Sequence, residues 1–321
     1  MAVTDRVIRI SGGGIAASVL ALQAIRRGLK VEGSWQGPAA SSLLASGIYN
    51  PIVLKRMKLV WRWKEALSEL EALYAWVDQT YGQHLLETEQ VHQRLDGAQK
   101  LNEWDGLRAD TPWSELLGTP VRWNEQWVGP VLRSGWVRVP RLLAFAQAQM
   151  APCSGEPVLA QVHCHGWADG VRKDGLSERS FNPVKGEVLR VLLPGYDAPG
   201  IVHGPVFILP LGEGCYQVGA TYQWDALDEM PSEKGKMELV KGLRSLWDGS
   251  FEIVEHRAAV RPATADRRPL VGAVGPGEWV LNGLGSRGIL LAPLLAAELL
   301  DQILGVGALS SDVDPSRFPG S

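Results

Sequence analysis

The chain has 321 residues, of which 45% are hydrophobic and 21% are charged. This is the composition of an ordinary globular protein, long enough for one large domain or two interleaved ones. Its formal net charge of −3 gives no overall positive field to attract nucleic acid or an anionic membrane surface. The three cysteines lack CxxC spacing, and no run of about 18 apolar residues predicts a membrane span. We therefore expect a cytoplasmic protein whose partner is a small molecule.

The N-terminal residues have the pattern of a βαβ unit. An apolar strand is expected at 7–10, followed by a glycine turn and a helix at 15–27, before a second strand begins at Lys30. The turn satisfies G-x-G-x-x-G/A in the strand-to-helix context that is typical of a dinucleotide site, where amides and the helix dipole bind a pyrophosphate. The residues predicted to contact the cofactor are Gly12, Gly13, Gly14, Ile15 and Ala16. The alternative is a glycine turn without a ligand.

The acidic residue that should close the second strand and hold the ribose hydroxyls is missing from its usual place. The expected position is near Trp35, and Glu32 falls earlier in the strand. Three alternatives are open: Glu32 acts from a shortened strand, Ser34 acts together with water, or the cofactor binds weakly.

The rest of the chain alternates helical and strand-like patterns. The spacing of apolar residues and a first-turn proline predict helices at 57–81, from Pro140 onward, at 233–247 and at 289–304. Strands are predicted at 158–162, 187–193, 206–211, 215–222 and 279–282, with an antiparallel sheet in 184–224. Residues 83–137 indicate short strands and loops, and the tail from 305 is expected to be irregular.

Four segments resemble, in the right order, motifs of the D-amino-acid-oxidase (DAO) family of flavoproteins, which includes glycine oxidase. The most specific runs from Arg261 to Gly272, R-P-A-T-A-D-R-R-P-L-V-G, and resembles the family signature R-P-x-T-x-D-x-x-P-x-h-G. The others are 282–293, similar to the last flavin loop and helix, 181–187, similar to the strand that enters the substrate sheet, and 45–51, similar to the second FAD loop. The Gly-Ser-Arg-Gly variant at 285–288 is particularly similar to the oxidase domain of bifunctional tRNA wobble-uridine modification enzymes.

The resemblance implies an α/β fold in which a Rossmann-type FAD-binding domain is interleaved with a smaller α+β substrate domain built on an antiparallel sheet. The FAD-binding domain would comprise 1–62, 138–183 and 262–321, and the substrate domain 63–137 and 184–261. Beyond the glycine turn, Glu32 and Ser34, the resemblance implies FAD contacts from Ser41, Ser42, Ala45, Ser46, Gly47, Gly166, Gly283, Gly285, Ser286, Arg287, Gly288 and Ile289. The helix that follows the last loop would direct its dipole at the edge of the flavin that becomes negative on reduction.

The resemblance also implies a substrate site. Arg261 matches the family's arginine that binds the substrate carboxylate, a role that suits a planar fork of parallel N–H donors. Tyr222 falls where the family has a pocket wall, and Arg287 belongs to the last flavin loop. The alternatives are that Arg261 pairs with Glu255 or Asp266, that Tyr222 only packs, and that Arg287 forms a surface salt bridge.

Two further stretches, 163–165 and 151–157, bear on metal binding and on the cover of the adenosine. His163 and His165 flank Cys164, but no fourth ligand is evident and the stretch resembles the family's final Rossmann strand, so no metal is predicted. Residues 151–157 stand where family members have a longer β-meander, which would leave the adenosine half of the site poorly covered.

The predicted function is FAD-dependent oxidation of the C–N bond of a small amine or amino acid, by hydride transfer to flavin N5. The imine would be hydrolysed by water, and O2 would reoxidise the flavin. One alternative is a tRNA wobble-uridine modification oxidase, for which the acidic composition shows no basic surface. Another is a non-catalytic flavin-binding module with a weakened ribose site.

Overall fold

The computed structural model of the chain describes residues 6–34, 40–167 and 180–318. Within these ranges, six strands form a sheet in the order β11-β2-β1-β12-β19-β18. All the pairings are parallel except that of β18 with β19. The strands are β1 (Val7–Ser11), β2 (Lys30–Ser34), β11 (Ala151–Pro152), β12 (Ala160–His163), β18 (Leu270–Gly275) and β19 (Glu278–Asn282). We call this part of the molecule the parallel-sheet half.

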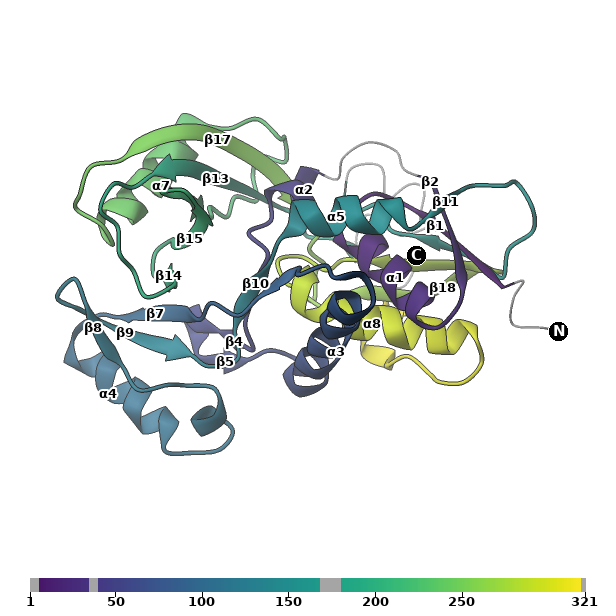
Figure 1. Cartoon of the computed structure of the whole chain (residues 1–321), viewed down its shortest axis with the longest axis horizontal. Helices are drawn as coiled ribbons and strands as arrows, with labels where there is room; N and C mark the ends of the chain where they lie inside the picture. The colour runs from purple at the N-terminus through teal and green to yellow at the C-terminus, as the bar shows by residue number, and fades with distance from the viewer. Residues whose placement is uncertain (1–5, 35–39, 168–179, 319–321) are drawn as a thin grey trace.

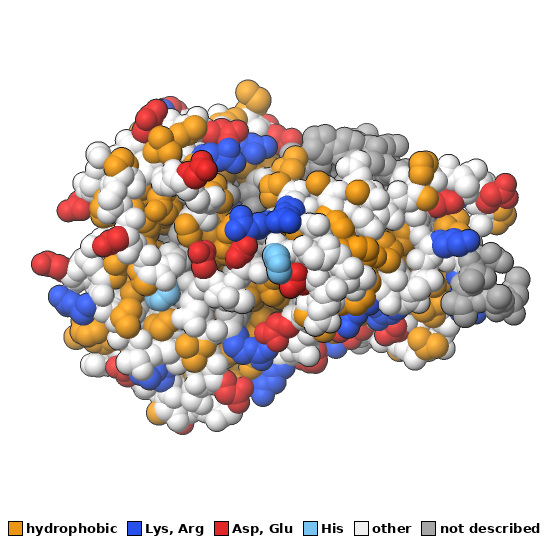
Figure 2. Space-filling model, in the orientation of Figure 1, with side chains coloured by type: hydrophobic (Ala, Val, Ile, Leu, Met, Phe, Trp, Pro, Cys, Tyr) orange, Lys and Arg blue, Asp and Glu red, His pale blue; other side chains and the backbone are white. Residues whose placement is uncertain are grey.

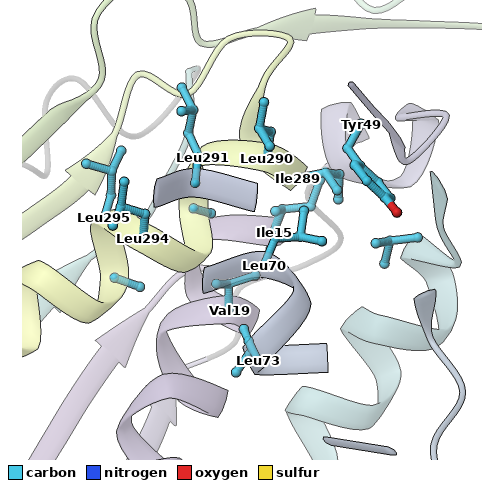
Figure 3. Close-up of a cluster of buried hydrophobic side chains, with 14 of the residues drawn as sticks. Ile15, Val19, Tyr49, Leu70, Leu73, Ile289, Leu290, Leu291, Leu294 and Leu295 are labelled. Carbon is cyan, nitrogen blue, oxygen red and sulfur yellow. The ribbon is translucent and has the colours of Figure 1, made fainter. Parts of the chain in front are cut away.

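Helices cover one face of this sheet. They are α1 (Ile15–Arg26), α3 (Trp63–Tyr81), α5 (Val139–Ala148) and α8 (Gly288–Ile303). α8 contacts α1 and α3, and α5 contacts α1. Figure 3 shows Ile15 and Val19 of α1 meeting Leu70 of α3 and Ile289 of α8 in one apolar cluster. A fully buried side chain such as Leu70 contributes about 1.5–3 kcal/mol relative to an exposed one, so this cluster fixes how the three helices sit.

A second, larger sheet lies beside the parallel-sheet half. Its eight described strands follow the order β17-β13-β16-β15-β14-β7-β9-β8, and all but the β14–β7 pair are antiparallel. They are β7 (Val91–Leu95), β8 (Val121–Trp123), β9 (Gln126–Val131), β13 (Val184–Leu192), β14 (Ile201–His203), β15 (Phe207–Gly212), β16 (Cys215–Gly219) and β17 (Glu252–Arg261). In Figure 1 this sheet occupies the left of the molecule, with α7 (Glu233–Arg244) behind β13 and β17. The mixed α/β fold predicted from the sequence is thereby confirmed.

Short elements connect the two sheets. A small sheet has the order β3-β10-β6, and β4 pairs with β5. These elements are α2 (Ala40–Leu44), β3 (Ile48–Tyr49), β4 (Ile52–Val53), β5 (Lys58–Leu59), β6 (Leu86–Glu87) and β10 (Gly135–Val137). The tail contains the 3₁₀ turns η5 (Ser311–Val313) and η6 (Pro315–Arg317). None of the helices in the described ranges is long and apolar enough to cross a membrane.

Several predicted elements have different limits in the structure. α3 begins at Trp63 instead of Met57, because Met57 and Arg62 have left-handed backbone (φ 44° and 53°) and β5 lies between them. β16 ends at Gly219, so Tyr222 lies beyond the strand. α7 ends at Arg244 and not at residue 247.

The prediction of only strands and loops in 83–137 was wrong, because helix α4 (Gly97–Arg108) lies there. The sequence of α4 has no apolar stripe at helical spacing, because Trp104 is the one side chain of this helix that is buried. Trp104 donates its indole N–H to O of Gly118 at 3.0 Å and packs against Gly129. The buried Trp104 therefore anchors α4, with the partly buried Leu101 and Leu107 also packed against the core.

The predicted domain division left α3 in the substrate domain. In the structure α3 packs against α1 and α8 of the parallel-sheet half. We therefore propose that residues 63–81 belong to the first domain.

On the face of the parallel sheet that is turned away from α1, the part formed by β1 and β2 carries polar side chains. Along β1, Ile8 and Ile10 are fully buried while Arg9 is half-buried, as expected for strand alternation. Arg9 binds the carboxylate of Glu32 at 2.7 Å, and the hydroxyl of Ser154 donates to the same carboxylate at 2.6 Å. The short 151–157 segment therefore covers this face with polar contacts.

Candidate active site

The glycine turn leads into a helix whose own N-cap residue provides no side chain to cap the first amides. Gly14 is the N-cap of α1 and provides no capping side chain. The N–H of Ile15 donates to Oγ of Ser42 in α2 at 3.1 Å, which joins two of the predicted cofactor loops. Gly12 has φ 122°, and a Cβ there would overlap the carbonyl of Cys164. Gly12 is therefore required for the close approach of β12 to the turn.

A second helix begins at the same place. Gly288 is the first residue of α8, and its N-cap, Arg287, provides no capping side chain. A Cβ added at Gly288 would lie 3.6 Å from Cγ2 of Ile15, the first residue of α1. Two helix N-termini whose N-cap residues provide no capping side chain thus meet, and both carry partial positive charge that favours an anionic group.

The loop before α8 is tied to the signature segment and to the end of β12. The N–H of Gly285 donates to O of Pro262 at 3.0 Å. Asn282 donates from Nδ2 to O of Gly166 at 2.9 Å and accepts at Oδ1 from the N–H of Gly283 at 2.7 Å. The structure therefore brings the predicted residues Gly166, Gly283 and Gly285 together with the segment that follows Arg261.

The second predicted cofactor loop, which follows α2, only partly faces the N-termini of α1 and α8. Ser42 contacts the N-terminus of α1, as described, but a Cβ at Gly47 would overlap the carbonyl of Val137 in β10. Gly47 (φ 76°) therefore permits a close approach between two backbone segments. Ser46 accepts at Oγ from the N–H of Ile48 at 3.4 Å, which stabilises the turn after α2.

At the ribose position, Glu32 is already engaged by protein partners. It accepts from Nε and Nη2 of Arg9 at 3.0 and 2.7 Å and from Ser154 at 2.6 Å. The hydroxyl of Ser154 and the guanidinium of Arg9 hold the pKa of Glu32 below its usual value. The side chain of Ser34, the other candidate, and all of Trp35 lie outside the described residues.

Arg261 crosses the neighbouring strand and stacks on a tyrosine. It pairs with Val184 across β17 and β13, and its guanidinium extends over Gly186 of β13. The guanidinium carbon lies 4.7 Å from the centroid of the Tyr222 ring, and Nη1 donates to O of Thr221 at 3.3 Å. Gly186 leaves the space that lets Arg261 reach Tyr222.

No described carboxylate forms an ion pair with Arg261. Of the two acids considered from the sequence, Glu255 lies near Arg190, at 3.5 Å, and Asp266 pairs with Arg317 at 2.8 Å. Burial lowers the pKa of the Arg261 guanidinium from its ordinary value, and the nearby Tyr222 opposes this shift. Arginine stays protonated in proteins despite such a shift. Arg261 is therefore a partly buried cation that stacks on the exposed side chain of Tyr222.

Lys185 and Glu187 point to the other side of the sheet from Arg261, as alternation along β13 requires. Lys185 donates to Asp228 at 2.7 Å, and Glu187 accepts from the hydroxyl of Ser232, the N-cap of α7, at 2.7 Å. These two residues fasten the segment that follows Tyr222. They are not part of the surface that Arg261 faces.

The histidines near the end of β12 have polar partners of their own. His163 lies 3.1 Å from Oγ of Ser11 through Nδ1 and 2.5 Å from Glu278 through Nε2. Its ring centroid is 5.5 Å from that of His165. In the described ranges, no group of three or more His, Cys, Asp or Glu side chains is arranged to hold a metal ion.

Part of the chain matches a known protein family. Residues 153–302 match the family model described as FAD dependent oxidoreductase, DAO. The chain contains a DAO-family FAD-dependent oxidoreductase domain. This confirms the resemblance found in the signature segment and the last loop, and the family is FAD-dependent.

Relatives of this DAO-family domain include two kinds of curated protein. A tRNA 5-methylaminomethyl-2-thiouridine biosynthesis bifunctional protein of Caulobacter sp. (strain K31) is 30% identical over 221 residues, covering 63% of this chain and 35% of the relative. A glycine oxidase of Bacillus licheniformis is 33% identical over 144 residues, covering 43% of this chain and 39% of the relative. The chain thus matches little more than a third of the length of these relatives.

A solved structure shares the fold over nearly the whole length. The iminodiacetate oxidase from Chelativorans sp. BNC1 superposes with a TM-score of 0.78, at 18% identity, covering 96% of this chain and 98% of that one. The similarity supports the arrangement of the two sheets in this DAO-family domain.

The two helix N-termini fit the dinucleotide part of FAD. Backbone amides at the N-termini of α1 and α8, where neither N-cap residue provides a capping side chain, offer donors and positive partial charge, as a pyrophosphate and a reduced flavin edge require. Glu32 does not fit the ribose equally well, because its carboxylate oxygens are satisfied by Arg9 and Ser154.

Two residues that shape this site, Gly186 and Ser154, were not predicted from the sequence. Gly186 leaves the space that the Arg261 side chain occupies. A glycine inside a strand is a known sign that another group approaches the backbone closely. Ser154 binds Glu32, and nothing in the local pattern of 151–157 indicated that contact.

Proposed function

We propose that this DAO-family domain oxidises the C–N bond of a small amine or amino acid that carries a carboxylate group. The observation that carries the proposal is Arg261, a partly buried guanidinium stacked on Tyr222 with no carboxylate partner among the described residues. Leaving a buried charge uncompensated costs several kcal/mol, so a site of this kind favours an anionic ligand. A substrate carboxylate matches the planar fork of the guanidinium.

The roles of the protein groups follow from this arrangement. Arg261 would orient the substrate through its carboxylate, and Tyr222 would form the adjacent wall. Bound FAD would supply the acceptor for the hydride that leaves the carbon next to the neutral amine. The lone pair of the amine nitrogen forms the new C=N bond, a proton leaves the nitrogen, and water hydrolyses the imine; O2 is the proposed final oxidant.

The proposed FAD site joins the two helix N-termini. Backbone amides of 12–16 and 285–288 would face the pyrophosphate and the flavin edge, with Ser42 and Gly166 at the border. Gly285 and Pro262 are hydrogen bonded, so this loop places the flavin side of the site next to Arg261.

A second candidate function rests on the relatives. A protein named for tRNA 5-methylaminomethyl-2-thiouridine biosynthesis is 30% identical to this chain over 221 residues, so oxidation of a modified tRNA base is the alternative substrate class. On the face shown in Figure 2, basic and acidic side chains are intermixed and no broad basic region gathers. A third candidate, a flavin-binding module without turnover, is motivated by the engaged Glu32.

Anaerobic bleaching of the flavin separates these functions. The protein is purified with FAD, and its absorbance is recorded as glycine, sarcosine or a D-amino acid is added without oxygen. We expect at least one small amine to bleach the flavin of the wild type, and to bleach that of Arg261→Met far more slowly. Bleaching only by modified tRNA would favour the second candidate, and a bound flavin that no amine bleaches would favour the third.

A further inference from the structure

The guanidinium of Arg261 lies beside apolar side chains on the same face of the larger sheet. A Cβ added at Gly186 would overlap this guanidinium, so the side chain of Arg261 lies on the face to which Gly186 is turned. Val188 follows Gly186 by two residues along β13, and Ala259 precedes Arg261 by two residues along β17. Side chains alternate along a strand, so these positions share one face, and two residues span about 7 Å.

Leu44, the last residue of α2, covers this face next to Arg261. Leu44, Val188 and Ala259 form one cluster of buried apolar side chains, against which the half-buried Phe207 packs. Figure 1 shows α2 beside the ends of β13 and β17, and α2 contacts β17. An apolar wall therefore closes the sheet surface within one side-chain position of the guanidinium.

Hydrogen bonds hold Leu44 in this place. Nε2 of Gln217 in β16 donates to O of Leu44 at 2.9 Å, which fastens the end of α2 to the sheet. In the same helix, Oγ of Ser42 accepts from the N–H of Ile15 at 3.1 Å. A ligand could displace Leu44 only by breaking these contacts, so the wall is fixed.

An open hollow of about 270 Å³ lies on the other side of Leu44 from Arg261. Its lining on β13 and β17 continues the same face of the sheet away from Arg261. The lining residues are Leu43, Leu44, Val188, Arg190, Gln217, Glu255 and Arg257. Leu44 therefore separates the guanidinium from existing space, and shortening its side chain would join the two.

The other sides of the guanidinium are occupied. Tyr222 stacks on it with 4.7 Å between the guanidinium carbon and the ring centroid, and Nη1 donates to O of Thr221. We propose that Leu44, together with Val188 and Ala259, limits how far the carbon chain of a ligand extends from Arg261, so that the preferred substrates are short carboxylate-bearing amines. This inference rests on the proposed function and specifies its substrate class.

Straight-chain carboxylates of increasing length test the proposal without turnover. Acetate, propionate, butyrate and valerate are titrated into the FAD-loaded protein while the flavin absorbance is followed. Because one methylene group in a closed apolar pocket changes affinity by about tenfold or more, we expect the wild type to bind valerate at least about tenfold more weakly than acetate. Equal or tighter binding of valerate would overturn the proposal.

Variants assign the limit to Leu44. In Leu44→Ala the ratio of the dissociation constant of valerate to that of acetate should fall by about tenfold or more. Leu243→Ala is the matched control, because Leu243 of α7 is also a buried helical leucine but belongs to a different apolar cluster. Leu243→Ala should keep the wild-type ratio.

An unchanged ratio in Leu44→Ala, with FAD retained, would show that the carbon chain takes another direction and would overturn the proposal. If Leu44→Ala does not retain FAD, Val188→Ala decides the matter, because Val188 lies outside the predicted flavin loops. The ratio should fall in Val188→Ala as well, and an unchanged ratio there would then overturn the proposal.

The two proposals fail in different ways. If no amine bleaches the flavin, the proposed oxidation is wrong, whatever the carboxylates do. If short amines bleach the flavin but chain length does not affect binding, the oxidation stands and only the limit set by Leu44 is wrong.

Discussion

Arg261 lies directly over Gly186 of the adjacent strand, and a Cβ added at Gly186 would overlap the guanidinium of Arg261. The arginine therefore reaches Tyr222 only because residue 186 has no side chain. If Arg261 binds the substrate carboxylate as we propose, Gly186 determines that binding although it offers no functional group.

Gly186→Ala should displace Arg261 and weaken binding of a carboxylate ligand. The loss of charge-assisted hydrogen bonds, each worth about 1.5–3 kcal/mol, corresponds to an affinity lower by about 10- to 100-fold. Ligand titration followed by flavin absorbance measures it. Gly106→Ala is the control, because a Cβ at Gly106 in α4 meets open space. Unchanged affinity in Gly186→Ala, with FAD retained, would show that Arg261 does not act from its observed position.

Glu187→Ala should destabilise the fold strongly. Glu187 is completely buried and accepts from Ser232, and it lies 2.7 Å from His256 and 3.9 Å from Lys185. Removing one partner of a buried charge cluster costs about 3–5 kcal/mol, which urea unfolding detects. Glu255→Ala, at a half-exposed site, should cost at most about 1 kcal/mol. Equal effects of the two changes would contradict the assigned role of Glu187.

Glu32→Gln should leave the dissociation constant of FAD almost unchanged. The carboxylate of Glu32 is occupied by Arg9 and Ser154, so it has little capacity to hold a ribose. Gly14→Val should weaken FAD binding markedly, because a branched side chain would stand where amides approach the phosphates. Fluorescence quenching of added FAD measures both. A large loss in Glu32→Gln would instead support the role in ribose binding expected from the sequence.

Stability should fall with acid because of His203. Burial lowers the pKa of His203 from 6.5 to about 4, and its Nδ1 lies 2.7 Å from Oε1 of Gln93. Between these two pH values the unfolded chain binds a proton that the folded chain does not, so stability is lost as pH falls from 6.5 toward 4. The loss is up to about 3 kcal/mol, at 1.36 kcal/mol per pKa unit.

The variant His203→Asn isolates this contribution, since it keeps a donor toward Gln93 without the titration. Its free energy of unfolding in urea should fall less steeply than that of the wild type across the same pH window. Parallel curves for the two proteins would mean that His203 is protonated equally in the folded and unfolded chains.

The sequence predicted best what depends on neighbours along the chain. The glycine turn, α1 and β2 follow from local periodicity, and the last loop and α8 follow from a glycine pattern ahead of an apolar run. The signature segment predicts a substrate-binding role for Arg261, and it could be found because that motif is continuous in the sequence. Fold class and family therefore follow from the sequence alone.

The sequence did not predict what depends on contacts between distant segments. The space that Gly186 leaves for Arg261 depends on the register between β13 and β17. The contact of Ser154 with Glu32 joins two residues that are 122 positions apart in the sequence. α4 was missed because it buries only Trp104. That Arg261 and Arg287 lack acidic partners among the described residues depends on where the fold places each nearby carboxylate, which no local pattern specifies.

The most direct test of the central claim, that Arg261 binds the substrate carboxylate, is the affinity of the FAD-loaded protein for glycolate. The flavin absorbance is followed in the wild type, Arg261→Met and Arg257→Met. We expect Arg257→Met to match the wild type and Arg261→Met to bind at least about tenfold more weakly, since charge-assisted hydrogen bonds are lost. Equal affinity of Arg261→Met and the wild type would contradict the claim.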